Sequence, residues 1–137
     1  MKYMLDTNMC IYIIKKHPAD VLKKFMNIKI GDVCLSSITL AELMYGVQKS
    51  HHQQKNNMAL QEFISPLDIV SFDDEAAIHY GQIRAFLEKK GSPIGPLDLM
   101  IAAHAQSLNS ILVTNNKKEF ARVPHLKIED WAHLKEK

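Results

Sequence analysis

The 137-residue sequence has only two cysteines, five glycines and five prolines, and its charges almost cancel, at a formal net charge of +2. So few cysteines exclude a small disulfide-held scaffold, and so little glycine and proline excludes collagen and low-complexity disorder. No apolar stretch approaches the ~20 residues that a membrane helix needs. The first residues also lack the apolar core of a signal peptide. These absences predict one domain over residues 1–137, located in the cytoplasm and without a membrane partner.

The two cysteines, Cys10 and Cys34, both lie in apolar surroundings. In a cytoplasmic protein such residues are usually buried, reduced thiols, and we expect this here. The sequence alone leaves a disulfide between them open.

The near balance of 17 basic and 15 acidic residues argues against a strongly basic domain that coats nucleic acid. The balance says nothing about where the charges lie. The positions of the acids therefore become the main question.

Short apolar runs separated by helical patterns predict an α/β fold with a mostly parallel sheet. The expected buried strands cover residues 3–5, 33–36, 67–72, 110–114 and, more weakly, 126–128. Helices are expected over 11–16, 38–47, 76–87, 97–107 and 57–64, and the polar stretch 49–57 is expected to be a solvated turn.

Residues with capping chemistry precede most of these helices. Thr7 or Asn8 suits the N-cap of the first helix, Ser36 or Ser37 that of the second and Asp73 that of the helix after the third strand. Pro96 suits the first helical position before residues 97–107.

Acidic and amide side chains gather near the carboxyl ends of the expected strands, where open α/β sheets bind ligands. Asp6 follows the first strand, and Glu42 lies early in the helix after the second. Asn115, Asn116 and Glu119 follow the fourth strand, and Asp98 opens the helix that precedes it. Four separate segments therefore offer oxygen atoms to one rim.

Each of these carboxylates alone has an ordinary explanation, because acids are favoured near helix N-termini and in turns. Together they are harder to explain. Two carboxylates about 5 Å apart repel by roughly 3 kcal/mol at an effective dielectric constant of 20. A hard divalent cation such as Mg²⁺, or Mn²⁺, removes this repulsion, so the pattern predicts a metal site.

Four ordered sequence blocks resemble the motifs of PIN-domain ribonucleases, and more closely those of VapC toxins of type II toxin–antitoxin systems. The blocks are MLDTN at 4–8, SSITLAELMYG at 36–46, GPLDLMIAAHA at 95–105 and LVTNNKKEF at 112–120. The resemblance implies a three-layer α/β/α sandwich with a five-stranded parallel sheet. It also implies that Asp6, Glu42 and Asp98 bind the metal.

The chain departs from the family pattern at Asn116, where many PIN domains have a fourth acid. Asn116 contacts the metal weakly or through water, or else Glu119 supplies the missing carboxylate; the sequence leaves both open. Thr7, Asn8 and Thr114 are expected to orient the ligands by hydrogen bonds.

The resemblance implies a Mg²⁺-dependent endoribonuclease toxin with Asp6, Glu42, Asp98 and Glu119 as the catalytic acids, using one or two ions. Its implied substrate is tRNA, in particular the anticodon region of initiator tRNA. Its implied partners are an antitoxin protein, which covers the groove beside the acids, and a second copy in a homodimer or a toxin–antitoxin hetero-oligomer.

RNA binding must depend on local charge, because the net charge is small. Lys49, Lys117 and Lys118 lie nearest the expected rim and are candidates for phosphate contacts. Tyr45 either stacks on an unpaired base or is a half-buried helix tyrosine, and the second is the commoner outcome. The seven histidines show no zinc-binding spacing.

Two other classes of protein share parts of this pattern. A phospho-receiver domain needs an acid after the third strand and a lysine after the last, whereas Asp73 and Asp74 suit a helix cap and Ile128 is followed by acids. A weakly active or inactive RNA- or protein-binding module of the same fold remains the alternative. Magnesium-dependent cleavage separates enzyme from module.

Overall fold

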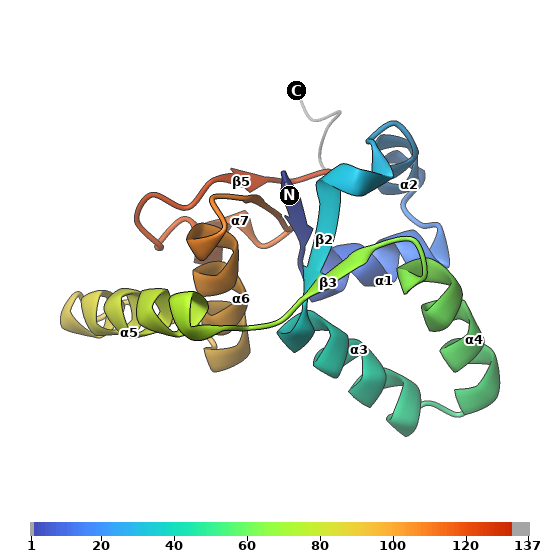
Figure 1. The fold of residues 1–137 in the computed structure, drawn as a ribbon, viewed down its shortest axis with the longest axis horizontal. Helices are drawn as coiled ribbons and strands as arrows, with labels where there is room; N and C mark the ends of the chain where they lie inside the picture. The colour runs from blue at the N-terminus through green and yellow to red at the C-terminus, as the bar shows by residue number, and fades with distance from the viewer. Residues whose placement is uncertain (1, 133–137) are drawn as a thin grey trace.

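The structure is a computed structural model that describes residues 2–132. Its five strands pair in parallel in the order β3-β2-β1-β4-β5 (Figure 1). They are β1 (Tyr3–Leu5), β2 (Val33–Ser36), β3 (Asp68–Val70), β4 (Ile111–Val113) and β5 (Ile128–Glu129). The central β1 places Tyr3 beside Val33 on one neighbour and Ile111 on the other. The predicted α/β class and five-stranded parallel sheet are confirmed.

Seven helices and one 3₁₀ turn connect the strands of the described part. The helices are α1 (Thr7–Lys15), α2 (Ala19–Met26), α3 (Ser37–Lys49), α4 (Gln53–Ile64), α5 (Asp74–Lys89), α6 (Pro96–Ser107) and α7 (Lys117–Phe120), and the 3₁₀ turn is Ile30–Asp32. Between residues 2 and 132, no helix is long and apolar enough to cross a membrane.

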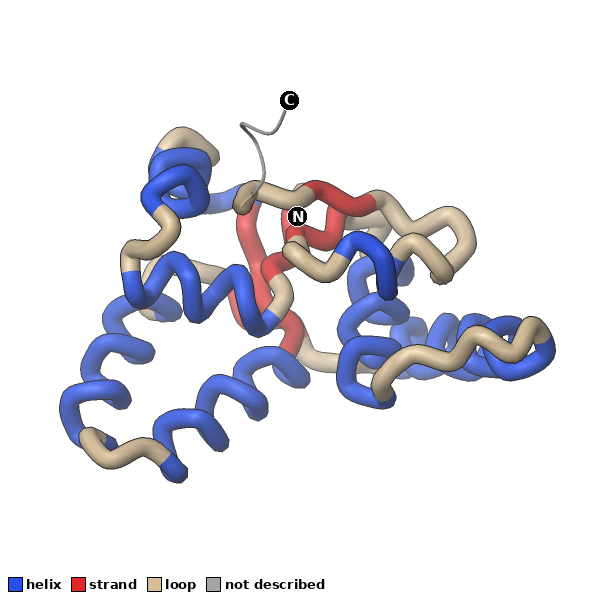
Figure 2. Tube along the Cα trace, turned by 180° about the vertical axis from the view of Figure 1, so that it is seen from behind, coloured by secondary structure: helices blue, strands red, loops and turns tan. Residues whose placement is uncertain are grey.

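The helices cover the two faces of the sheet as two layers, α1–α4 on one side and α5–α7 on the other (Figures 1 and 2). Successive strand residues point to opposite faces, so Leu5 belongs to the first core and Met4 to the second. Leu43, Val47 and Leu60 pack into the first core, and Ile101 and Phe120 pack into the second. All five side chains are buried. The expected three-layer sandwich follows from this alternation.

Three of the expected helix starts are confirmed and one is wrong. Ser36 caps α3 through the backbone N–H of Ile38, Asp73 caps α5 through that of Ala76, and Pro96 is in the first turn of α6. The N-cap of α1 is Asp6, not Thr7 or Asn8, because its carboxylate accepts the N–H of Met9. Helix α1 therefore begins directly at the end of β1.

The stretch 49–57 is largely helical, which corrects the expected turn. Helix α4 begins at Gln53, four residues before the predicted start. Its first turn is fully exposed and therefore carries no apolar periodicity, and Gln53 Nε2 donates to the carbonyl of Gln48 to close the α3–α4 turn. Helix α2 was not predicted.

The third strand is an edge strand rather than a buried one. Asp68 and Ile69 are exposed, and pairing with β2 covers only one side of β3. The two cysteines are free and buried, Cys10 in the first core and Cys34 in the second, on opposite faces of the sheet. The expectation of reduced thiols is confirmed.

Candidate active site

Asp6 lies at the centre of the carboxyl edge of the sheet, where β1 passes into α1. Its Oδ1 accepts the N–H of Met9 at 2.9 Å, and its own N–H donates to the carbonyl of Val113 on β4 at 3.0 Å. Burial raises the pKa of Asp6 to about 6, against hydrogen bonds from Thr114 and Met9 that lower it. The charge of Glu42 adds to the increase. The surroundings of Asp6 therefore oppose the ionisation of its carboxyl group.

Glu42 reaches the same edge from the second turn of α3, whose start is fixed by the Ser36 cap. The Thr7 hydroxyl donates a short hydrogen bond to Glu42 Oε1. Since Thr7 directly follows Asp6, this bond joins the start of α1 to α3. Thr7 thus contacts one of the expected site carboxylates.

Asp98 lies in the first turn of α6, two residues after Pro96. Burial raises its pKa to about 7, and a hydrogen bond with Glu119 and the charges of Glu119, Asp6 and Glu42 act in the same direction. A hydrogen bond between two carboxyl groups requires a proton on one of them. The other three acids are thus close enough to Asp98 to oppose its ionisation.

Glu119, in the short helix α7, is held by two donors. The N–H of Gly95 donates to its Oε2 at 3.2 Å, and the side-chain amide of Asn116 donates to its Oε1 at 2.7 Å. Asn116 is itself fixed by its N–H, which donates to the Thr114 hydroxyl at 2.9 Å. The amide nitrogen of Asn116 thus faces Glu119, and Glu119 faces Asp98.

The other residues expected at the site differ in burial and in the element that carries them. Thr114 is buried beside Asp6, whereas Asn8 is exposed in the first turn of α1. Lys49 lies at the end of α3, and Lys117 and Lys118 are exposed at the start of α7, in the same short helix as Glu119.

Two further residues that contact this edge were missed by the sequence reasoning. Tyr12 on α1 accepts a hydrogen bond of 2.6 Å from the side-chain amide of Asn115, which follows β4. Asp130 follows β5 and is close enough to raise the pKa of Asp6 further. The rule that selected Asp6, a polar residue directly after a strand, also applies to Asp130 and could have found it.

The donor set fits a hard divalent cation. All four charged groups are carboxylates, and burial and mutual repulsion oppose the charge of Asp6 and Asp98, a cost that a cation would offset. In residues 2–132, no three His, Cys, Asp or Glu side chains are grouped closely enough to hold an ion alone. Water would therefore complete the coordination, as is usual for Mg²⁺.

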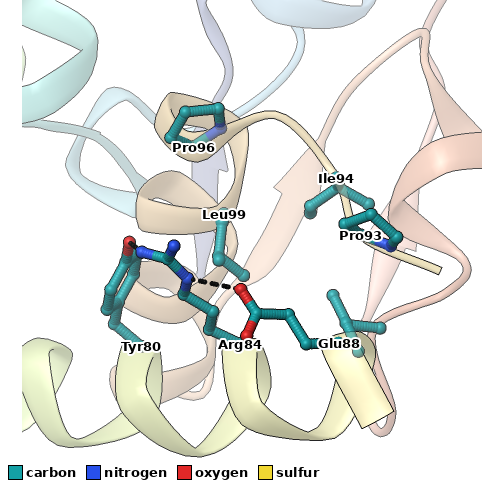
Figure 3. Close-up of a pocket in the computed structure, with 8 residues that line it drawn as sticks. Tyr80, Arg84, Glu88, Pro93, Ile94, Pro96 and Leu99 are labelled. Atoms are coloured by element: carbon teal, nitrogen blue, oxygen red, sulfur yellow. Dashed lines mark hydrogen bonds and ion pairs between the residues drawn. The ribbon is translucent and has the colours of Figure 1, made fainter. Parts of the chain in front are cut away.

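Two hollows lie near this edge. A groove of about 420 Å³ runs between α1, α3 and α4, and Glu42 and Lys49 line it together with apolar residues such as Leu43. A smaller pocket of about 140 Å³ lies between α5 and the loop before α6 (Figure 3). Arg84 in that pocket is bound to Glu88 and to the Tyr80 hydroxyl, both at 2.9 Å, and none of the four acids lines it.

Comparisons with known proteins agree with this geometry. Residues 3–126 match the PIN domain family. The chain is 50% identical over 131 residues to the tRNA(fMet)-specific endonuclease VapC of Salmonella typhimurium, covering 96% of this chain and 98% of the relative. It is 49% identical over 132 residues to the enzyme of the same name from Shigella flexneri, covering 96% and 99%.

Solved structures give the same result. The crystal structure of DNA-bound VapBC from Salmonella typhimurium superposes with a TM-score of 0.91 at 50% identity, covering 96% of this chain and 98% of that one. VapBC2 from Rickettsia felis, bound to a promoter DNA fragment, gives 0.87 at 44% identity, covering 96% and 99%. The chain therefore belongs to the PIN-domain family, among the VapC ribonucleases.

Proposed function

We propose that this chain is the toxin of a toxin–antitoxin pair and that it acts in the cytoplasm as a Mg²⁺-dependent endoribonuclease on tRNA, in the anticodon region of initiator tRNA. One observation carries the proposal: four chain segments bring carboxylates to one sheet edge, where burial first, and then the hydrogen bond with Glu119 and the charges of the other three acids, raise the pKa of Asp98 to about 7. The names of the Salmonella and Shigella relatives, tRNA(fMet)-specific endonucleases, support the choice of substrate.

Asp6 and Asp98 are assigned to direct metal ligation, and Glu42 to ligation or to orientation of the attacking water. Glu119 is assigned the fourth carboxylate position. When bound, Mg²⁺ supplies a water of lowered pKa and neutralises charge on the phosphodiester oxygens; Mn²⁺ can act in the same way. Thr7 orients Glu42, and Thr114 orients Asp6, through the hydrogen bonds described above.

The lysines beside the site are assigned to the RNA backbone. Lys49 lines the same groove as Glu42, and Lys117 and Lys118 lie two residues and one residue before Glu119. These three lysines place cations beside the acids, a distribution that the net charge of +2 does not reveal. Contacts with phosphate position the strand but do not select its sequence.

The apolar groove between α1, α3 and α4 is assigned to the antitoxin. Its lining of Ile11, Ile14, Leu43 and Leu60 suits the apolar face of a partner segment, and Glu42 at its edge suits a basic side chain. The VapBC structures from Salmonella and Rickettsia, both toxin–antitoxin complexes, support such a partner. A hetero-oligomer with the antitoxin, or a homodimer, is the proposed assembly.

Sequencing the 5′ ends of cellular RNA after brief induction of the toxin tests the substrate. New ends concentrated at one position of one tRNA support the proposal. Ends scattered through messenger RNA would show a general ribonuclease instead.

Cleavage of purified tRNA tests the chemistry. We expect cleavage with Mg²⁺, none with EDTA, and none by Asp6→Ala or Asp98→Asn protein whose circular dichroism matches the wild type. Cleavage by Asp98→Asn protein at the wild-type rate would contradict the assignment, and no cleavage by the wild-type protein would favour a binding module.

A further inference from the structure

Helix α3 presents one aromatic ring and one cation on the same side as a site carboxylate. Glu42, Tyr45 and Lys49 are spaced at i, i+3 and i+7, and therefore form one stripe along the helix. With a rise of 1.5 Å per residue, Tyr45 lies about 4.5 Å and Lys49 about 10.5 Å along the axis from Glu42. Both side chains are therefore close enough to contact nucleotides that neighbour the bond cleaved at the acids.

The ring of Tyr45 is free to take a ligand. Its side chain is 65% exposed, so it is not the half-buried helix tyrosine that was the commoner expectation. The Lys49 ammonium lies 5.2 Å from the centre of the ring. Gly46, the next residue, would meet nothing within 4 Å if it carried a side chain, so the helix surface beside the ring is open.

A second pair, on helix α5, also consists of an exposed aromatic ring with a lysine ammonium beside it. Phe86 is 40% exposed on α5, and the Lys90 ammonium lies 5.4 Å from its ring centre. Helix α5 carries none of the four acids. An exposed aromatic–lysine pair is thus not unusual in this chain, and what distinguishes Tyr45 and Lys49 is that they share a helix with Glu42.

The chemistry of this stripe matches single-stranded RNA. An exposed aromatic ring stacks on an unpaired base, and a lysine contacts the adjoining phosphate. Lys15, at the end of α1, lines the same groove as Glu42 and Lys49 and adds a second cation to it. A paired helical stem offers phosphates but keeps its bases stacked inside, so the ring would add nothing to its binding.

We propose that Tyr45 stacks on an unpaired base next to the cleaved phosphodiester and that Lys49 contacts the neighbouring phosphate. This inference rests on the proposed ribonuclease function and adds to it a determinant of substrate choice. The stripe directs cleavage to a loop, because only a loop presents a free base within reach of the acids.

The test compares Tyr45→Ala and Tyr45→Phe proteins on two synthetic anticodon stem-loops, one intact and one with an abasic nucleotide beside the cleaved bond. On the intact RNA, we expect Tyr45→Ala to raise KM roughly tenfold with little change in kcat, whereas Tyr45→Phe stays near the wild type. On the abasic RNA, the wild type and Tyr45→Ala should have the same KM. Phe86→Ala is the matched control and should behave as the wild type on both.

RNA binding by a variant that does not cleave gives a second readout. In an Asp98→Asn background, 2-aminopurine in place of the base should change its fluorescence on binding, and Tyr45→Ala should abolish the change. Lys49→Gln should weaken binding of both RNAs and reduce the dependence of log K on log salt by about one contact.

Four results would overturn the inference. Equal effects of Tyr45→Ala on intact and abasic RNA would show that the ring does not stack on that base. An unchanged KM together with weaker antitoxin binding, or with a shift in oligomeric state by light scattering, would assign the ring to a protein interface. Failure of the wild type to cleave any RNA would overturn the proposed function as well, whereas cleavage unaffected by Tyr45→Ala overturns this inference alone.

Discussion

The side-chain amide of Asn116 donates a 2.7 Å hydrogen bond to Oε1 of Glu119, and the N–H of Gly95 donates to the other oxygen of the same carboxylate. Asn116 thus presents a nitrogen, rather than an oxygen, towards the acids. Of the two alternatives that the sequence left open, this arrangement supports Glu119 as the fourth carboxylate. We propose that Asn116 holds Glu119 in place.

Substitution at these two positions separates their roles. We expect Glu119→Gln to reduce kcat for RNA cleavage strongly, because the charge is lost while the shape is kept. Asn116→Ala should reduce it less, by about 10-fold to 100-fold, as for residues that orient ligands. The measurement is single-turnover cleavage at saturating Mg²⁺. A larger loss in Asn116→Ala than in Glu119→Gln would reverse the assignment.

Asp98→Asn is expected to stabilise the metal-free protein while it abolishes cleavage. The substitution removes a carboxylate whose ionisation is opposed by burial and by Glu119. After allowance for partial exposure, the gain is about 1 kcal/mol in the free energy of unfolding at neutral pH. Thermal unfolding in EDTA measures it, and Asp74→Asn, at an exposed acid in the first turn of α5, is the control. A lower Tm for Asp98→Asn would contradict the account.

The metal-free protein should lose stability as the pH rises from about 4 to about 7. The pKa values of Asp6 and Asp98 are raised to about 6 and about 7 from 3.8. The folded protein therefore binds more protons than the unfolded chain in this range, and the contribution of these two groups is complete below pH 4 and lost above pH 7.

Denaturant midpoints at pH 5 and pH 7.5 in EDTA measure this slope. The control is the double variant Asp6→Asn/Asp98→Asn, in which the slope should largely disappear. Mg²⁺ should stabilise the wild type more at the higher pH, because ion and proton compete for the same oxygens. An equal gain from Mg²⁺ at both pH values would argue against binding at these acids.

Thr7→Val should lower activity without unfolding the protein. The Thr7 hydroxyl is the donor to Glu42, and valine keeps the shape but removes that bond. We expect a loss of 10-fold to 100-fold in kcat/KM. Thr7→Ser retains the hydroxyl and should remain near the wild type, so the comparison of valine with serine isolates the hydrogen bond.

Strands and their order in the chain could be predicted from the sequence because apolar runs and capping residues are local signals. Ser36, Asp73 and Pro96 have the expected roles at helix starts. The position of Asp6 was also predictable, because a strand in the middle of a parallel sheet must end at the edge where ligands bind.

Other features depend on contacts distant in sequence. Asp6, rather than Thr7, caps α1 because β1 ends without a linker, and Thr7 is then left to bond Glu42, 35 residues away. The orientation of the Asn116 amide depends on where Gly95 and Asp98 place Glu119, which no local pattern encodes. The start of α4 at Gln53 was missed because an exposed first turn has no apolar periodicity.

The four carboxylates come from both helical layers: α1 and α3 bring Asp6 and Glu42, and α6 and α7 bring Asp98 and Glu119. They can meet only when β4 has paired with β1, which joins residues more than a hundred positions apart. With Glu119 as the proposed fourth carboxylate, the chain must be made at least as far as this residue, and folded, before it can cut RNA. The order of the segments thus delays the activity of each new molecule until translation of most of its sequence is complete.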